Sequence, residues 1–161
     1  MRKLVMLKTL VIYFSVSGCT KRVAQLMAYK LGADLYQIKS EKPYQLDDLN
    51  WMCANSRANN EQKDKSCRPQ YSGSLPDVSE YDRIIFGHPV WWGIPPRIMY
   101  TVIEKLNLNN KTIAVFGTSD GTSYKQSQSE MYALLDDLFI EGDILSDSQS
   151  IDQWLEGNAL K

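Results

Sequence analysis

The feature that most constrains this chain is an unbroken apolar run that ends in small hydroxyl residues. Residues 9–20 have the sequence TLVIYFSVSGCT. A strand that is buried on both faces has a continuous apolar run, because helices cover both sides of a parallel sheet. Residues 10–14 have this pattern, so the sequence predicts a central parallel strand there.

The loop after this strand has the composition of an anion site. It offers three hydroxyls and a glycine, from Ser15, Ser17, Thr20 and Gly18, directly before a segment with apolar residues three or four apart. A helix start there presents unpaired N–H groups and the positive end of the helix dipole. Neither the Walker pattern nor the dinucleotide fingerprint is present, which favours a terminal phosphate held by neutral donors. The alternative is that Ser17 or Thr20 only caps the helix.

Composition limits the class of protein. The chain has 161 residues, 43% of them hydrophobic, and a formal net charge of -1, which suits a single globular domain over residues 1–161. Near-neutral charge argues against a nucleic-acid partner, and no apolar run approaches the roughly 20 residues that span a bilayer. We therefore expect a soluble, cytoplasmic protein with no membrane partner. Three unclustered cysteines and one histidine indicate neither a metal site nor a disulfide framework.

Strands and helices are predicted to alternate along the rest of the chain. Further strands are expected at residues 34–39, 83–87 and 112–117, with a weak fifth candidate at 139–145 that Gly142 interrupts. Alternation of this kind implies a parallel sheet covered on both faces, with right-handed crossovers.

Two features of the remaining sequence carry specific expectations. The polar stretch at residues 41–76 is expected to contain a helix around residues 47–58 and to run over the surface near a ligand. The last helix is expected to begin with a capping box formed by Ser150 and Gln153.

Two adjacent tryptophans follow the third predicted strand, in the sequence HPVWWGIPP of residues 88–96. Adjacent side chains diverge at a strand end, so we expect at least one of Trp91 and Trp92 to lie against a planar ligand. The alternative is that both cover the sheet edge. His88 lies between a buried strand and a proline, and is expected to be a packed or hydrogen-bonded residue and not a general acid.

Three predicted loops leave the carboxyl ends of apolar strands, where ligands bind in sheets of this kind. Residues 15–20 offer hydroxyls for a phosphate, residues 88–93 offer indoles for a flat ring, and residues 118–123 offer small residues and backbone donors for the polar edge of that ring. A ligand with a terminal phosphate and a planar heteroaromatic body has the shape of FMN. The sequence therefore predicts FMN as cofactor.

The motifs Ser-x-Ser-Gly-x-Thr, Gly-x-Pro-x-Trp-Trp and Thr-Ser-x-Gly resemble those of the flavodoxin family, in particular its shorter bacterial members. The resemblance covers nearly the whole chain. It implies a three-layer α/β/α flavodoxin-like sandwich, a five-stranded parallel sheet of order 2-1-3-4-5, and noncovalent FMN. The cofactor-binding residues that it implies are Ser15, Val16, Ser17, Gly18, Cys19 and Thr20 at the phosphate, Pro89, Val90, Trp91, Trp92 and Gly93 beside the isoalloxazine, and Thr118, Ser119, Asp120 and Gly121 along its other side or pyrimidine edge.

The chain departs from the pattern of this family at three positions. Ser17 stands where threonine is commoner, Gly93 where an aromatic residue is common, and Asp120 where a small residue is usual. An ionised Asp120 near the ring would disfavour negative charge on a reduced flavin.

Two functions remain open at this stage. One is a one-electron carrier that docks on a redox partner protein, and the other is an FMN-dependent NAD(P)H:quinone-type oxidoreductase with a small-molecule acceptor. Carriers of this family are usually markedly acidic, because their docking is electrostatically steered, whereas this chain is nearly neutral. The oxidoreductase would need a nicotinamide site, for which we find no motif. We expect a monomer or a weak homodimer.

Two other classes of protein are alternatives. A phosphorylated receiver domain would need an acidic cluster after the first strand and an aspartate at the end of the third, where this chain has Ser15 and Gly87 followed by His88. A flavin-free interaction module is the remaining alternative.

Overall fold

The computed structural model describes residues 7–136 and 139–161. Four parallel strands form its sheet, in the order β2-β1-β3-β4. Their bounds are β1 (Thr9–Phe14), β2 (Asp34–Ile38), β3 (Arg83–Pro89) and β4 (Thr112–Thr118). The order and the parallel direction confirm the predicted fold class, with β1 at the centre and β2 at the edge.

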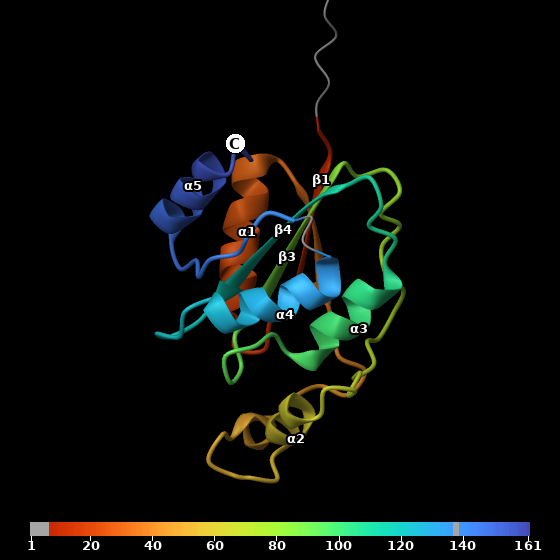
Figure 1. The fold of residues 1–161 in the computed structure, drawn as a ribbon, viewed down its shortest axis with the longest axis vertical. Helices are drawn as coiled ribbons and strands as arrows, with labels where there is room; N and C mark the ends of the chain where they lie inside the picture. The colour runs from red at the N-terminus through yellow and green to blue at the C-terminus, as the bar shows by residue number, and fades with distance from the viewer. Residues whose placement is uncertain (1–6, 137–138) are drawn as a thin grey trace, which may run out of the picture.

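Helices cover both faces of this sheet (Figure 1). They are α1 (Cys19–Leu31), α3 (Arg97–Lys105), α4 (Lys125–Leu135) and α5 (Ser148–Gly157), whereas α2 (Arg57–Lys63) lies on a segment beyond the end of the sheet. Along β1, Ile12 belongs to the core cluster that includes α3 and α4, and Val11 to the cluster that includes α1 and α5. Both side chains are fully buried. A helix layer on each face is the reason that the strand has a continuous apolar run from Leu10 to Phe14.

The sheet has four strands among the described residues, and the predicted fifth strand is reduced to two isolated bridges. Ile140 and Ile144 each form a parallel bridge to β4. Between them, the N–H of Gly142 donates to Gln128 Oε1 at 2.9 Å and not to a strand. A Cβ atom on Gly142 would come within 2.4 Å of the Tyr124 ring. The ring of Tyr124 therefore occupies the place where a regular fifth strand would carry a side chain.

The helix expected around residues 47–58 is wrong in position. A short 3₁₀ turn spans Leu46–Leu49, and α2 begins at Arg57 after Ser56, whose side chain accepts the N–H of Asn59. In Figure 1 this segment projects from the end of the sandwich. Ser56 is a strong N-cap, which explains the later start.

Side-chain contacts fix this projecting segment. The Arg57 guanidinium lies 3.7 Å from the centre of the Tyr44 ring, donates to Glu61 at 3.0 Å and donates to the Lys42 carbonyl at 2.7 Å. Burial, followed by the hydrogen bond to Glu61, raises the pKa of Tyr44. The polar stretch therefore has a defined structure of its own.

The capping box predicted for the last helix is also wrong. The box is formed one turn earlier, where Asp147 Oδ1 accepts the Ser150 N–H at 2.8 Å and Ser150 Oγ accepts the Asp147 N–H at 3.1 Å. The predicted buried side chains of this helix, Ile151, Trp154 and Leu155, are buried. The sequence also places Leu138 at helical spacing on the apolar face of the preceding helix, and this residue lies outside the described residues. None of the described helices has the length and apolar character needed to cross a membrane.

Candidate functional site

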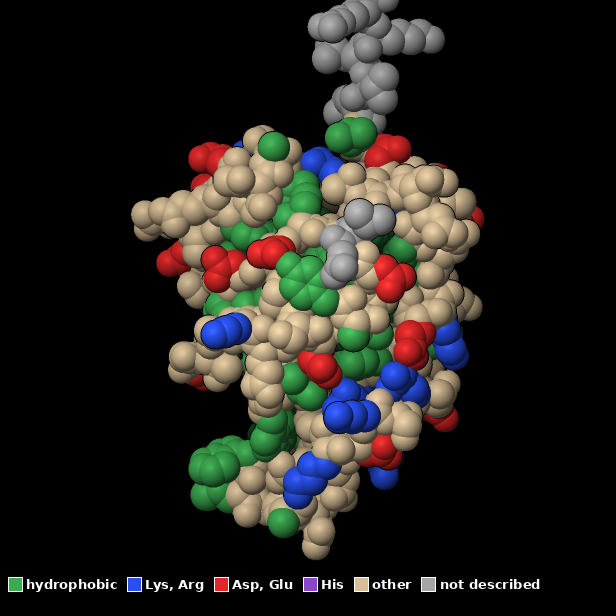
Figure 2. Space-filling view, viewed as in Figure 1, with side chains coloured by type: hydrophobic (Ala, Val, Ile, Leu, Met, Phe, Trp, Pro, Cys, Tyr) green, Lys and Arg blue, Asp and Glu red, His purple; other side chains and the backbone are tan. Residues whose placement is uncertain are grey.

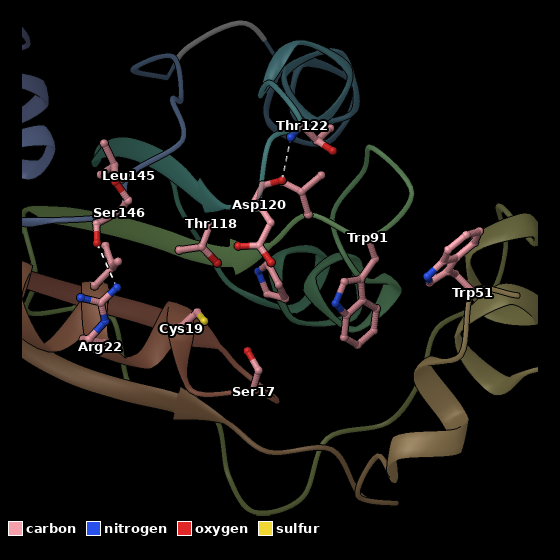
Figure 3. A pocket seen from close by; sticks show the side chains of 14 residues that line it. Ser17, Cys19, Arg22, Trp51, Trp91, Thr118, Asp120, Thr122, Leu145 and Ser146 are labelled. Atoms are coloured by element: carbon pink, nitrogen blue, oxygen red, sulfur yellow. Dashed lines mark hydrogen bonds between the residues drawn. The ribbon is translucent and has the colours of Figure 1, made fainter.

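A cavity of about 530 Å³ lies where β1, β3 and β4 end (Figure 3). Segments that are far apart in the sequence line it. They are Ser17, Cys19, Arg22 and Val23 from the first loop and α1, Trp51 from the polar stretch, Pro89, Val90 and Trp91 at and after the end of β3, Thr118, Ser119, Asp120 and Thr122 at and after the end of β4, and Leu145 and Ser146 before α5.

The start of α1 forms one end of this cavity. Gly18 is the N-cap residue, with a φ of 98°, a left-handed conformation that glycine adopts without steric cost. Among the described residues, no side chain caps this helix start, so the alternative that Ser17 or Thr20 is only a cap is wrong. Ser15 Oγ instead accepts the Gly18 N–H at 3.2 Å and shapes the loop. The first N–H groups of a 13-residue helix are therefore left for another acceptor.

A buried hydrogen bond joins the first turn of α1 to the end of β4. Thr20 Oγ1 and Thr118 Oγ1 lie 2.7 Å apart, and both residues are buried. A buried hydroxyl without a partner would cost free energy. The pair therefore fixes the distance between two of the three loops that line the cavity.

The two tryptophans after β3 point to different places because they flank a tight turn. Trp91 and Ile94 exchange both backbone hydrogen bonds, at 2.9 and 3.2 Å. Trp92 and Gly93 between them have φ values of 55° and 85°, as in a type I′ turn. Trp91 lines the cavity, whereas Trp92 lines a separate cavity of about 350 Å³.

Trp91 is positioned by other aromatic rings. Its ring lies edge-on to those of Phe14 and Tyr44, with centroids 5.8 and 5.3 Å away. The Gln62 amide donates to the Trp91 carbonyl at 3.0 Å. These contacts hold the indole at the wall of the cavity.

Beneath this turn, His88 is fully buried and neutral at pH 7. Burial lowers its pKa to about 4. Its Nδ1 lies 2.8 Å from the Pro89 carbonyl oxygen, which can only accept, so Nδ1 carries the proton. Nε2 therefore accepts from the Tyr124 hydroxyl, also at 2.8 Å. His88 is a hydrogen-bonded core residue, as the sequence predicted.

The fold matches that of known proteins. A family model described as Flavodoxin matches residues 8–158. The chain belongs to the flavodoxin family. A comparison with curated protein sequences gave no match.

Solved structures of similar flavoproteins support this membership in the flavodoxin family. A candidate flavoprotein from Bacteroides eggerthii DSM 20697 is 37% identical, with a TM-score of 0.90, over 96% of this chain and 99% of that one. A candidate flavoprotein from Bacteroides uniformis ATCC 8492 is 34% identical, with a TM-score of 0.89, over 93% of this chain and 98% of that one. A flavoprotein from Lactobacillus acidophilus NCFM, solved in complex with FMN, is 29% identical, with a TM-score of 0.72, over 91% of this chain and 97% of that one.

The structure brings together part of the flavodoxin-like set of site residues that the sequence predicted. The predicted residues that line the cavity are Ser17, Cys19, Pro89, Val90, Trp91, Thr118, Ser119 and Asp120. The others lie elsewhere. Ser15 and Val16 line a neighbouring cavity of about 440 Å³, Thr20 is buried against Thr118, and Trp92 lines the third cavity. Gly18, Gly93 and Gly121 all have positive φ, and the lining set of the first cavity includes none of them.

Sequence reasoning missed several lining residues. Arg22 follows the predicted phosphate loop at helical spacing, and its Nη2 donates to the Ser146 carbonyl at 3.1 Å (Figure 3). Its position one turn into that helix, next to the predicted phosphate loop, was the sequence signal that could have identified it. Trp51 was also missed, although a tryptophan within a polar stretch is unusual. Val23, Thr122, Leu145 and Ser146 complete the missed set.

Proposed function

We propose that this chain binds FMN noncovalently in the cavity at the ends of β1, β3 and β4 and acts as a flavodoxin-like electron-transfer protein. The observation that carries the proposal is that the three predicted loops line one cavity, with an uncapped helix start at one end and an indole at the other. A volume of about 530 Å³ suits a ligand of this size. The Lactobacillus acidophilus flavoprotein, solved with FMN, supports the choice of cofactor.

The residues at the first end suit the phosphate of FMN. Ser17 offers a hydroxyl donor, and Cys19 is the first residue of α1, where backbone N–H groups and the helix dipole favour an anion. Arg22 adds a cation on the same wall. These three residues would hold the phosphate and set the orientation of the whole cofactor.

The residues at the other end suit a planar ring. Trp91 offers a large aromatic surface that its neighbours hold in place, and Pro89 and Val90 extend it. The loop from Thr118 to Thr122 offers polar groups for the ring edge. When bound, FMN would supply the redox chemistry, while these residues bind it, orient it and exclude water.

A titration of the FMN-free protein tests this proposal. We expect FMN to bind at one site per chain, with quenching of flavin fluorescence and a visible circular dichroism signal. The loaded protein should take up electrons from a chemical reductant and return them to a one-electron acceptor. Protein that stays colourless after incubation with excess FMN and removal of the free cofactor would contradict the proposal.

A second function, an FMN-dependent NAD(P)H:quinone-type oxidoreductase, is favoured by one specific observation. The cavity that Trp92 lines is also lined by Lys63 and Lys65, cations that suit the phosphates of a dinucleotide, whereas Arg97 in the same lining is buried and lies 3.6 Å from Glu130. If this function is correct, the loaded protein oxidises NADPH when given a quinone. Lys63→Glu should then slow the reaction, whereas Lys125→Glu, on α4 and outside the lining set, should not.

A further inference from the structure

An exposed tryptophan stands at the rim of the proposed cofactor cavity. Trp51 is 71% exposed, yet its side chain lines the same cavity as Trp91. In Figure 3 its indole stands across from that of Trp91, on a separate segment. Figure 2 shows apolar side chains gathered on the projecting lobe that carries this segment. An indole exposed at a cavity rim keeps a large apolar area in water until something covers it.

The backbone beneath Trp51 is fixed by buried groups. The amide of Asn59, a residue that is only 5% exposed, donates to the Trp51 carbonyl at 3.2 Å and to the Cys53 carbonyl at 2.6 Å. The N–H of Met52 is held in turn by Asn50 Oδ1 at 3.1 Å. A buried amide therefore fixes the backbone of the turn that presents the exposed indole.

The order of residues along the cavity shows which part of a ligand would meet Trp51. Arg22, Cys19 and Ser17 lie toward one end in Figure 3, and Trp91 and then Trp51 toward the other. A ligand whose phosphate is held at the start of α1 would extend its planar ring toward the two indoles.

We propose that Trp51 is a ring-binding residue, whose indole packs on the planar ring of the cofactor at the end away from the phosphate and shields it from water. This inference rests on the proposed FMN function. Trp51 belongs to the polar stretch at residues 41–76, so this stretch would close the end of the cavity away from the phosphate. Burial of the indole on binding would remove apolar surface from water on both molecules.

The test compares two ligands and three variants by fluorescence titration of the FMN-free protein. FMN has the phosphate, and riboflavin has the same ring without it. We expect Trp51→Ala to weaken the binding of both ligands about tenfold, the size typical of a lost aromatic stack. Trp51→Phe should recover most of that loss. Met52→Ala, which alters an equally exposed side chain outside the cavity lining, should change neither affinity.

Two further readouts separate a binding role from a structural one. The thermal unfolding midpoint of Trp51→Ala should equal that of the unaltered protein, because the side chain is mostly exposed. Iodide should quench the fluorescence of the bound flavin more strongly in Trp51→Ala, because the indole no longer shields the flavin ring from solvent.

Each contrary outcome has a distinct meaning. Failure of the unaltered protein to bind FMN overturns the proposed function and this inference with it. Unchanged affinity of Trp51→Ala for both ligands overturns only the inference. The exposed indole would then belong to a surface that docks another protein. A loss of affinity for FMN but not for riboflavin would place Trp51 at the phosphate and would also overturn it.

Discussion

The two ends of the cavity are built in different ways. The proposed phosphate end comes from consecutive residues, in which β1, the loop to Gly18 and the first turn of α1 follow one another. The ring end takes Trp51, Trp91 and Asp120 from three distant segments. The first end therefore depends on local backbone conformation, and the second on the packing of side chains that only the folded chain brings together.

This difference predicts how each end responds to change. Backbone donors at a helix start are insensitive to distant substitutions, because the helix itself sets their positions. The indoles depend on partners such as Phe14, Tyr44 and Asn59. Substitutions should therefore fall into two groups, those that weaken binding of the phosphate of FMN and those that weaken binding of its ring.

The largest effect should come from Ser17→Asp. A carboxylate at this position would repel the phosphate of FMN, and we expect a loss of affinity of at least about a hundredfold, since a like charge at close range costs several kcal/mol. Riboflavin, which has no phosphate, should bind with nearly its original affinity. Titration of both ligands measures the contrast, and equal losses for the two would show that the phosphate lies elsewhere.

The next largest effect concerns stability in acid. The pKa of His88 falls from its usual 6.5 to about 4 on burial, so the unfolded chain binds this proton more readily than the folded one. Its contribution to stability is full above about pH 6.5 and is lost as the pH falls toward 4, by about 3 kcal/mol in total.

Urea unfolding of the FMN-free protein across this range measures that loss. In His88→Gln the stability at neutral pH should be lower, and this part of the pH dependence should disappear. An unchanged slope would contradict the assignment to His88.

A smaller effect is expected from Trp91→Ala, which removes the cavity-facing indole. We expect FMN and riboflavin to lose affinity by similar factors, each about tenfold. Stability should also fall, because the Trp91 ring packs on Phe14 and Tyr44. Trp92→Ala, which removes an indole from a different cavity, should cost far less affinity. The reverse order would mean that the ring lies on the Trp92 side of the turn.

The last expected effect comes from Thr20→Val, which breaks the hydrogen bond between the first turn of α1 and the end of β4. Thr118 Oγ1 would lose its buried partner, at a cost of about 1–3 kcal/mol in the free energy of unfolding. The double variant with Thr118→Val should recover part of that loss, because neither hydroxyl then remains unpaired. Denaturant unfolding of the two single variants and the double variant forms the test. Strictly additive losses would mean that the two hydroxyls are not coupled.

Much of the fold was predictable because its signals are local. The continuous apolar runs at β1, β3 and β4 require helices on both faces of a parallel sheet. The sequence could not show that residues 139–145 would form isolated bridges instead of a regular fifth strand. The ring of Tyr124 takes the space at Gly142, and this contact depends on tertiary packing. The start of α5 was misplaced because Ser150 and Asp147 are both good N-cap residues, and their mutual hydrogen bonds decide between them.

By itself, the sequence determined the buried strands and the hydroxyl-rich loop before α1, because each depends on residues that are neighbours in the chain, and its resemblance to the flavodoxin family implied the strand order. The tertiary structure alone decided which indole enters the cavity, since the left-handed turn at Trp92 and Gly93 sends the two rings apart. It also placed Trp51 opposite Trp91, because the buried amide of Asn59 on α2 holds the backbone at Trp51, a contact that the local sequence does not predict. Long-range packing fixes the ring end of the site, and local pattern cannot predict it.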